Sequence, residues 1–439
     1  MLSRSGIQFR LLPVCKGGGF ILSGDDTMTR RKDIFLLILC WVIYTLAQLG
    51  RYSYSSNTSL IIDKFGIDHA PAAVPSTAFF FAYGIGQIVV ALVCGKYNTR
   101  IMVSLALVVS GACNAAVFFC TQFAPITYLW LVNGFAQANL WPVLLLVLRR
   151  KLSPSMLTIA GIVMSTASTG GRFAAIGVCA LFAIDPSMFT YSFLLAALLS
   201  LSVAVIWFIF VGDSRTKEVG QVAIEEKKQE KKPTSSGRFV FILLVFAEFS
   251  CVSYAVSGGL QQWVPSILKE VFHMEDWAAI LLSVFLPLFT VSVAFISPLL
   301  YNIFKNYVVV SLISFILGGI VVAVMTAVMK VNWLPLMITF VFEAICMGIV
   351  SNSTTVQVPL TLEGKWSAGF LAGILNGSCY LGSALSSYVL GKTADTVGWT
   401  GAFTILFGLI LISAVLALIY LIYERRHKKM QLAEVSQEN

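Results

Sequence analysis

Long apolar runs, each about the length of a membrane-spanning helix, alternate with short polar connections along most of the chain. A helix needs roughly 20 predominantly apolar residues to cross the hydrocarbon core of a bilayer. We therefore expect an all-α membrane protein with twelve transmembrane helices. The pattern places them near residues 34–57, 74–95, 101–119, 128–148, 156–182, 190–211, 239–264, 277–304, 307–329, 334–358, 368–391 and 400–423.

One connection differs from the others in its length and charge. Residues 212–238 are rich in Lys and Glu, contain Pro and Ser, and show no apolar periodicity, which is typical of a solvated linker. The linker separates two bundles of six predicted helices each, residues 30–211 and 239–424. Residues 1–29 lack the apolar core of a secretory signal, so we interpret them as a disordered or misassigned leader. Residues 425–439 form a polar tail.

The composition supports this interpretation, because 58% of residues are hydrophobic and only 12% are charged, against about 25% charged in soluble domains. The basic residues gather in the N-terminal segment, the even-numbered connections and the tail, which excludes a nucleic-acid-binding surface. The opposite connections hold only Lys64, Lys269, Lys330 and Lys392. Since Lys and Arg favour the cytoplasmic side, we expect a multi-pass plasma (inner) membrane protein with both termini in the cytoplasm.

Catalytic and metal-binding patterns are missing from the sequence. The nine cysteines form no CxxC pair, and the three histidines lie in predicted connections or in the tail. No phosphate-binding loop or catalytic triad occurs. We therefore expect no metal, no cofactor and no enzyme activity.

Arg51 lies in the middle of an apolar helix, in the segment FLLILCWVIYTLAQLGRYSYSSN. A charge near the bilayer centre costs at least about 2.5–3.5 kcal/mol, so it usually serves a function. Tyr44, Gln48 and Ser55 share a helical face with Arg51, at spacings of i, i+4, i+7 and i+11. This stripe predicts the wall of a binding cavity.

Other polar residues inside predicted helices are candidates for the same cavity. Arg172 in the fifth helix is a second intramembrane cation, and an ion pair with an intramembrane acid is its structural alternative. Isolated polar residues in spans also serve as hydrogen bonds between helices, so that alternative stays open for the rest. They are Asn133 and Gln137 in the fourth helix, Ser250, Tyr254, Ser257 and Gln261 in the seventh, and Asn376, Tyr380, Ser383 and Ser387 in the eleventh.

Glu248 and Glu343 are the acids deep inside predicted helices. A buried carboxyl group can exchange a proton near neutral pH, so proton coupling is one hypothesis and a fixed ion pair is the other. Glu343 shares a face with Ser351 and Thr354, which favours a position on the cavity. Glu248 points nearly opposite to the polar stripe of the seventh helix.

Several segments together resemble a known group of transporters. They are LGRYSYSSN in the first helix, FAYGIGQ in the second, GKYNTR in the next loop, NGFAQANLWP in the fourth helix, LQQWVPSILKEVF after the seventh, and YLGSALSSYVLGKTADTVGWTGAF around the eleventh. On these segments and on its six-plus-six organisation, the chain resembles the major facilitator superfamily. Within it, the chain resembles the organophosphate–phosphate antiporters, which include the sugar-phosphate and glycerol-phosphate permeases, over nearly all of residues 34–424. The resemblance implies two bundles that rock about a site near the midplane.

The resemblance also implies roles for particular residues. In that family two arginines, on the first and seventh helices, hold the phosphate, and Arg51 falls on the first position. Tyr44 and Tyr380 match tyrosines that line the site. The departures are Ser257 at the second arginine position, Gln87 at a lysine position of the second helix and Ser168 at a histidine position of the fifth. Half of the phosphate clamp is therefore missing, which weakens the expectation of phosphate exchange.

The predicted function is secondary active transport of a small organic anion, an organophosphate or a related metabolite, by a protein that works as a monomer in the lipid bilayer. Phosphate or a proton would be the coupling ion. One alternative is proton-coupled transport of a carboxylate or another non-phosphorylated solute, through Glu343 and Glu248. Another is a non-transporting membrane sensor of an external metabolite. The predicted substrate-binding residues are Arg51 as the anchor, with Tyr44, Gln48, Gln137, Arg172, Ser257, Gln261 and Tyr380.

Overall fold

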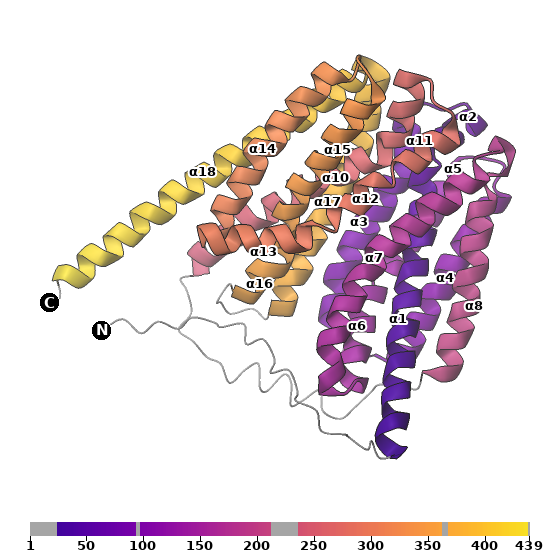
Figure 1. Cartoon of the computed structure of the whole chain (residues 1–439), viewed down its shortest axis with the longest axis horizontal. Coiled ribbons are helices and arrows are strands. Elements are labelled where there is room, and N and C mark those ends of the chain that lie inside the picture. Colours follow the sequence, from indigo (N-terminus) through magenta and orange to yellow (C-terminus); the bar gives the residue numbers. More distant parts are fainter. Residues whose placement is uncertain (1–23, 94–96, 212–235, 362–367, 438–439) are drawn as a thin grey trace, which may run out of the picture.

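The computed structural model of the chain describes residues 24–93, 97–211, 236–361 and 368–437, which are almost wholly helical (Figure 1). A helix satisfies its backbone hydrogen bonds within one segment, which a bilayer demands because it supplies no water partners. The predicted all-α membrane fold is confirmed.

The described helices form two groups that pack beside one another (Figure 1). The first group comprises α1 (Gly24–Ser56), α2 (Thr58–Phe65), α3 (His69–Val93), α4 (Thr99–Phe119), α5 (Ala124–Gln137), α6 (Leu140–Lys151), α7 (Pro154–Phe182), the short η1 (Pro186–Met188) and α8 (Tyr191–Phe210). The second comprises α10 (Ser236–Phe272), α11 (Asp276–Leu282), α12 (Phe285–Thr290), α13 (Val293–Phe304), α14 (Tyr307–Val328), α15 (Trp333–Asn352), η2 (Ser353–Gln357), α16 (Val358–Thr361), α17 (Ala368–Val397) and α18 (Trp399–Gln437).

Ten segments of the described chain are long and apolar enough to cross a membrane. The other two predicted spans, residues 156–182 and 368–391, correspond to the long helices α7 and α17. Both helices are rich in Gly, Ser and Thr, which lowers their mean hydropathy. A helix that faces other helices or a cavity tolerates such residues, because small side chains allow close approach of backbones.

Three helices extend into the predicted leader, linker and tail. Helix α1 begins at Gly24, inside the predicted leader, and α10 begins at Ser236, inside the predicted linker. Helix α18 continues to Gln437 through most of the predicted tail. The tail contains no proline and many good helix formers, so nothing in it ends the helix. Residues 1–23 and 212–235 lie outside the described part of the chain.

The apolar core is divided between the two groups of helices. One cluster is built from α1, α4, α6, α7 and α8 and contains Trp207, while another is built mainly from α10, α14, α15, α17 and α18 and contains Phe315 and Trp263. A third cluster joins the groups, since it contains Trp130 of α5 together with Tyr380 of α17. Each group thus has a core of its own, and the contact between them is partly apolar.

Helices α3 and α17 carry much of this contact between the groups. The Thr77 hydroxyl donates to the Ala384 carbonyl at 3.0 Å, and a Cβ at Gly84 would lie 3.1 Å from the Gly377 carbonyl oxygen. The two backbones therefore approach closely enough that a side chain at Gly84 would crowd the partner helix. The interface between the groups is tight along these helices.

The span at residues 277–304 is discontinuous and forms α11, α12 and α13 in place of one helix. Discontinuous helices are common in transporters at places where backbone lines a cavity. Thr290 ends α12, and its hydroxyl donates to the Pro287 carbonyl at 2.9 Å. The break turns the end of α12 toward the interior of the molecule.

Gly382 of α17 is expected to be intolerant of a side chain. A Cβ at this position would lie 2.0 Å from the carbonyl oxygen of Cys251 in α10. We expect Gly382→Ala to lower the free energy of unfolding by about 1–3 kcal/mol, because overpacking forces backbone shifts. The apparent thermal unfolding midpoint of the purified protein measures this effect.

Gly408 of α18 provides the matched control, since a Cβ there would meet nothing within 4 Å. Gly408→Ala should leave the midpoint unchanged or raise it slightly, because alanine favours a helix over glycine by up to about 1 kcal/mol. Equal midpoints for the two variants would show that α10 and α17 do not approach as described.

Candidate functional site

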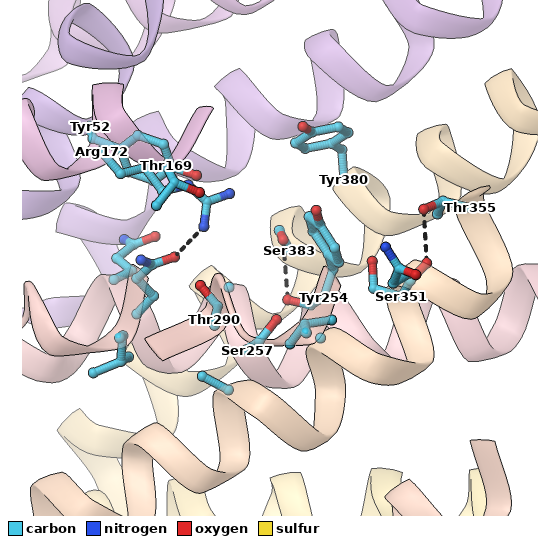
Figure 2. Close-up of a pocket in the computed structure, with 18 of the residues that line it drawn as sticks. Tyr52, Thr169, Arg172, Tyr254, Ser257, Thr290, Ser351, Thr355, Tyr380 and Ser383 are labelled. Atoms are coloured by element: carbon cyan, nitrogen blue, oxygen red, sulfur yellow. Dashed lines mark hydrogen bonds between the residues drawn. The ribbon is translucent and has the colours of Figure 1, made fainter. Parts of the chain in front are cut away.

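A cavity of about 340 Å³ lies between the two groups of helices. Its walls come from α1, α3 and α7 of the first group and from α10, α12, α13, α15, η2 and α17 of the second (Figure 2). The lining residues are Tyr52, Ser55, Phe80, Thr169, Arg172, Tyr254, Ser257, Gly258, Gln261, Gln262, Leu286, Thr290, Val293, Ala344, Gly348, Ser351, Asn352, Thr355, Val356, Tyr380 and Ser383. Hydroxyl, amide and aromatic groups dominate this set.

Helical periodicity explains how the second group presents this polar wall. On α10, Tyr254, Ser257 and Gln261 recur at i, i+3 and i+7, so that one face of the helix borders the cavity. On α15, Gly348 and Ser351 have the same spacing. The polar stripe predicted for the seventh helix therefore faces the cavity over these residues.

Arg172 of α7 is the one charged residue among the described residues that line the cavity. Its Nη1 donates to Gln261 Oε1 at 3.1 Å, a hydrogen bond that crosses from the first group to the second (Figure 2). The guanidinium carbon lies 4.9 Å from the ring centre of Tyr52, and the buried Nε has no hydrogen-bond partner. An unsatisfied donor on a buried cation favours an anion as the missing partner.

Two tyrosines of the second group lie across the cavity from Arg172 and Tyr52 (Figure 2). The rings of Tyr254 and Tyr380 are 5.7 Å apart. The Ser383 hydroxyl of α17 donates to the Tyr254 carbonyl of α10 at 3.1 Å, so the two helices that carry these tyrosines are joined beside the cavity. A phenol offers both an apolar ring and a hydroxyl, a combination that suits a polyhydroxylated solute.

Arg51 lies outside the cavity lining in this conformation, although Tyr52 and Ser55 of the same helix border the cavity. Its side chain is 4% exposed and packs against aromatic rings, with centres 4.0 Å away for Tyr83 and 5.4 Å away for Tyr380. Its Nε and Nη1 have no hydrogen-bond partner. Tyr380 therefore lies near Arg51 and also borders the cavity.

The remaining predicted residues of the first group make contacts between helices and do not border the cavity. Gln48 Nε2 donates to the Ser168 hydroxyl of α7 at 3.3 Å. The Tyr44 ring lies 4.6 Å from that of Trp141. Gln137 Nε2 donates to the Ser110 hydroxyl at 2.9 Å. In this conformation, Gln48 and Gln137 therefore serve as hydrogen bonds between helices, which was the alternative to a binding role.

Glu343 and the half-buried Glu248 also lie away from the cavity. Glu343 is fully buried, its two carboxyl oxygens have no partner, and Oε2 would be 3.3 Å from a Cβ at Gly318 of α14. The predicted cavity position of Glu343 is therefore not the observed one, because the helix turns the neighbouring Ala344 to the cavity. Glu248 accepts a hydrogen bond of 2.7 Å from Ser413 of α18.

Several lining residues were absent from the predicted site. Tyr52 lies one position, or about 100° around the helix, from the predicted Arg51 stripe. Its spacing of i, i+3 to Ser55 is the signal that could have identified it. Thr290 and Asn352 gave no usable signal, since α12 is a short piece of a broken span and Asn352 precedes the π-helical turn η2.

Comparisons with known proteins agree with this architecture. The sequence profile of the Major Facilitator Superfamily matches residues 40–364. Over 420 residues the chain is 24% identical to a probable hexose phosphate transport protein of Chlamydia trachomatis, a match that covers 85% of this chain and 88% of that protein. It is 26% identical over 107 residues to the membrane sensor protein UhpC of Escherichia coli, and this match spans only 24% of either chain.

The fold is also similar to solved transporter structures. A bacterial homolog of the human lysosomal transporter Spinster, in an inward-facing and occupied conformation, has a TM-score of 0.72 at 13% identity, with 88% of this chain and 96% of that one covered. A D-xylose–proton symporter has a TM-score of 0.71 at 11% identity, with 88% and 97% covered. At these identities the likeness concerns the fold alone. The family resemblance predicted from the sequence is confirmed, and the chain belongs to the major facilitator superfamily of transporters.

Proposed function

We propose that the protein is a secondary active transporter of a small organic anion, with phosphorylated metabolites as the leading class. The observation that carries this proposal is the position of Arg172, the one cation among the described lining residues of an otherwise uncharged polar cavity. Guanidinium groups bind carboxylate and phosphate oxygens through paired hydrogen bonds. The similarity to proteins named as hexose phosphate transporters supports the same class of solute.

Alternating access is the proposed mechanism. The cavity is bounded by both groups of helices, and the Arg172–Gln261 hydrogen bond joins them across it. A solute that contacts both groups favours the state in which they enclose it, because a ligand shifts an equilibrium through its differential affinity. The distribution of Lys and Arg supports an orientation in a plasma membrane with both termini in the cytoplasm, and we propose that a monomer performs the cycle.

Ligand-induced stabilisation of the purified protein tests the substrate class. We would compare a hexose 6-phosphate, the corresponding free hexose and inorganic phosphate, each at saturating concentration. A ligand at 100 times its Kd stabilises the folded state by about 2.7 kcal/mol, which raises the thermal midpoint. We expect the phosphorylated sugar to raise the midpoint and the free hexose to leave it unchanged. An equal rise with the free hexose would contradict anion recognition.

Uptake of the labelled hexose phosphate into proteoliposomes then separates transport from sensing. We expect uptake into vesicles loaded with inorganic phosphate or the unlabelled ester. The 107-residue similarity to a membrane sensor motivates the other outcome. A protein that binds the ester but exchanges nothing would be a sensor.

Proton coupling is the second candidate function, and Glu343 favours it. A fully buried carboxyl group without partners is stable only in its neutral, protonated form. A conformational change that supplied a partner or water would release that proton. We expect Glu343→Gln, which mimics the protonated form, to abolish uptake driven by a pH gradient and to leave solute exchange intact.

Ser413→Ala, which removes the hydrogen bond to Glu248, is the matched control and should retain gradient-driven uptake. Gradient-driven uptake that persists in Glu343→Gln would exclude Glu343 as the coupling group.

A further inference from the structure

Helices α2 and α11 lie at the end of the molecule away from the described chain ends (Figure 1). Charged side chains from the two groups of helices meet there. His69, the first residue of α3, lies between two acids of the second group. Its Nε2 is 2.6 Å from Glu270 Oε1 of α10, and its Nδ1 is 2.7 Å from Asp395 Oδ1 of α17. We call these three residues the His69 cluster.

Asp395 also caps the beginning of α3 from the other group of helices. Its Oδ1 accepts the backbone N–H of His69 at 3.0 Å, and its Oδ2 accepts that of Ala70 at 2.7 Å. The first N–H groups of a helix have no partner within the helix, and a carboxylate there is stabilising. Separation of the two groups of helices would leave these N–H groups without that cap.

Two tryptophans hold the His69 cluster in place. The rings of Trp263 and Trp399 lie 5.4 Å and 5.2 Å from the His69 ring. Trp399 Nε1 donates to Glu270 Oε2 at 2.9 Å. At Gly391 a Cβ would lie 2.9 Å from the His69 carbonyl oxygen, so α17 approaches the start of α3 closely.

A second set of ion pairs joins the groups beside the His69 cluster. Lys269 of α10 pairs with Asp63 of α2 and lies 2.9 Å from Asp276 Oδ1 of α11. Asp276 also accepts a hydrogen bond of 3.1 Å from the Ser59 hydroxyl of α2. Asp63 and Asp276 face Lys269, whereas the charged groups that face His69 in the described chain are Glu270 and Asp395.

With Glu270 and Asp395 ionised, the geometry requires a charged imidazole. A neutral imidazole has one N–H donor, whereas an imidazolium has two. Both ring nitrogens of His69 lie within hydrogen-bond distance of a carboxylate oxygen, so both contacts are satisfied together only when the ring is protonated. The side chains of His69, Glu270 and Asp395 are 16%, 39% and 19% exposed, so protons of the aqueous phase can reach them.

We propose that the His69 cluster is a proton-sensitive latch that holds the two groups of helices together at the end away from the described chain ends. Alternating access requires this end to open, so the proposal rests on the transport mechanism proposed above. The latched state binds a proton on His69, and the open state loses both carboxylate partners of that proton. Acidic medium at this end therefore favours the latched state, and alkaline medium favours the open one.

A distance measurement between the groups tests the latch without any substrate. Spin labels are placed at Gln122, between α4 and α5, and at Lys330, between α14 and α15, both exposed and at the same end. Unnatural amino acids carry the labels, so that the native cysteines stay in place. Distances are compared at about pH 5.5 and about pH 9, on either side of the ordinary histidine pKa of roughly 6.5.

In the wild-type chain we expect a short distance at the acidic pH and a longer-distance population that grows at least about fivefold at the alkaline pH. His69→Gln should show the longer distance at both pH values. His69→Lys, which keeps a cation, should show the short distance at both. The double variant Glu270→Gln/Asp395→Asn should lose the pH response while retaining the histidine.

His273→Asn is the matched control, because His273 is exposed at the same end and asparagine tolerates its positive φ of 54°. It should keep the wild-type pH response. A wild-type distance that does not change with pH, or a pH response that survives in His69→Gln, overturns the latch. A pH response in a protein that exchanges no organic anion would instead overturn the proposed function alone.

Discussion

Replacing Arg172 with glutamine is expected to weaken the binding of an organic anion about 100-fold. Arg172 is the charged group of the described cavity lining, and its Nε has no protein partner. Truncation of one member of a desolvated, hydrogen-bonded charge pair costs roughly 2–5 kcal/mol, and about 2.8 kcal/mol corresponds to a hundredfold loss. The Kd of a hexose 6-phosphate, measured by calorimetry on the purified variant, checks this prediction.

Two further variants show whether the lost affinity comes from the charge of Arg172 or from its planar guanidinium. They are Arg172→Lys and, as a control in the same lining, Thr169→Ser. The lysine keeps the charge and loses the planar fork, so we expect an intermediate loss of about tenfold. Thr169 lines the cavity one turn away and carries no charge, so Thr169→Ser should bind as the wild type does. An unchanged Kd in Arg172→Gln would mean that the anion is held elsewhere.

Replacing Arg51 with methionine is expected to abolish exchange, by about 100-fold or more, while the ligand-free protein keeps or gains thermal stability. Arg51 is buried with two nitrogens unpartnered, so removing its charge relieves a desolvation cost. The lost contacts with the rings of Tyr83 and Tyr380 offset about 0.5–2 kcal/mol of that gain. A cation kept at a cost to stability is consistent with a role in the transport cycle.

Measuring exchange and the unfolding midpoint on the same Arg51→Met preparation distinguishes this role from a structural one. A structural role predicts a lower midpoint together with lost exchange. Arg51→Lys should also lose most exchange, because the point charge of an ammonium group does not replace the planar, multidentate guanidinium. Tyr380→Phe keeps the ring beside Arg51 and should preserve the midpoint. Near-normal exchange in Arg51→Met would remove Arg51 from the mechanism.

The cavity and the His69 cluster connect the same two groups of helices at different depths. Arg172 and Gln261 meet at the cavity, whereas His69 meets Glu270 and Asp395 at the end away from the described chain ends. Opening that end must break the ion pairs of His69 and Lys269, whose residues are not among those that line the cavity. We therefore expect substitutions at Arg172 to change solute affinity. We expect substitutions in the His69 cluster to change the balance between conformations.

The periodicity of the sequence predicted the helical membrane fold and the polar stripe of α10 that borders the cavity. It placed Ser257 and Gln261 on one face, and both line the cavity. Arg172 and Tyr380 also line it, which agrees with the position expected of them from the polar pattern and the resemblance. The sequence can indicate such positions because each depends on one helix, whose geometry is local.

Other positions depended on how each helix is rotated among its neighbours. A shift of one residue turns a side chain by about 100°, so Tyr52 borders the cavity while Arg51 packs against the rings of Tyr83 and Tyr380. The same rotation places Ala344 on the cavity and Glu343 against α14.

The sequence by itself determined that this chain crosses a membrane as helices, that it belongs to its family and that two arginines, Arg51 and Arg172, lie inside long helices. These properties follow from hydropathy, local periodicity and short motifs, which each segment carries alone. Only the tertiary structure decided which of those arginines faces open space and which acids meet His69, because such contacts join residues hundreds of positions apart. The packing of all the helices together sets these contacts, and no single segment of the sequence encodes them.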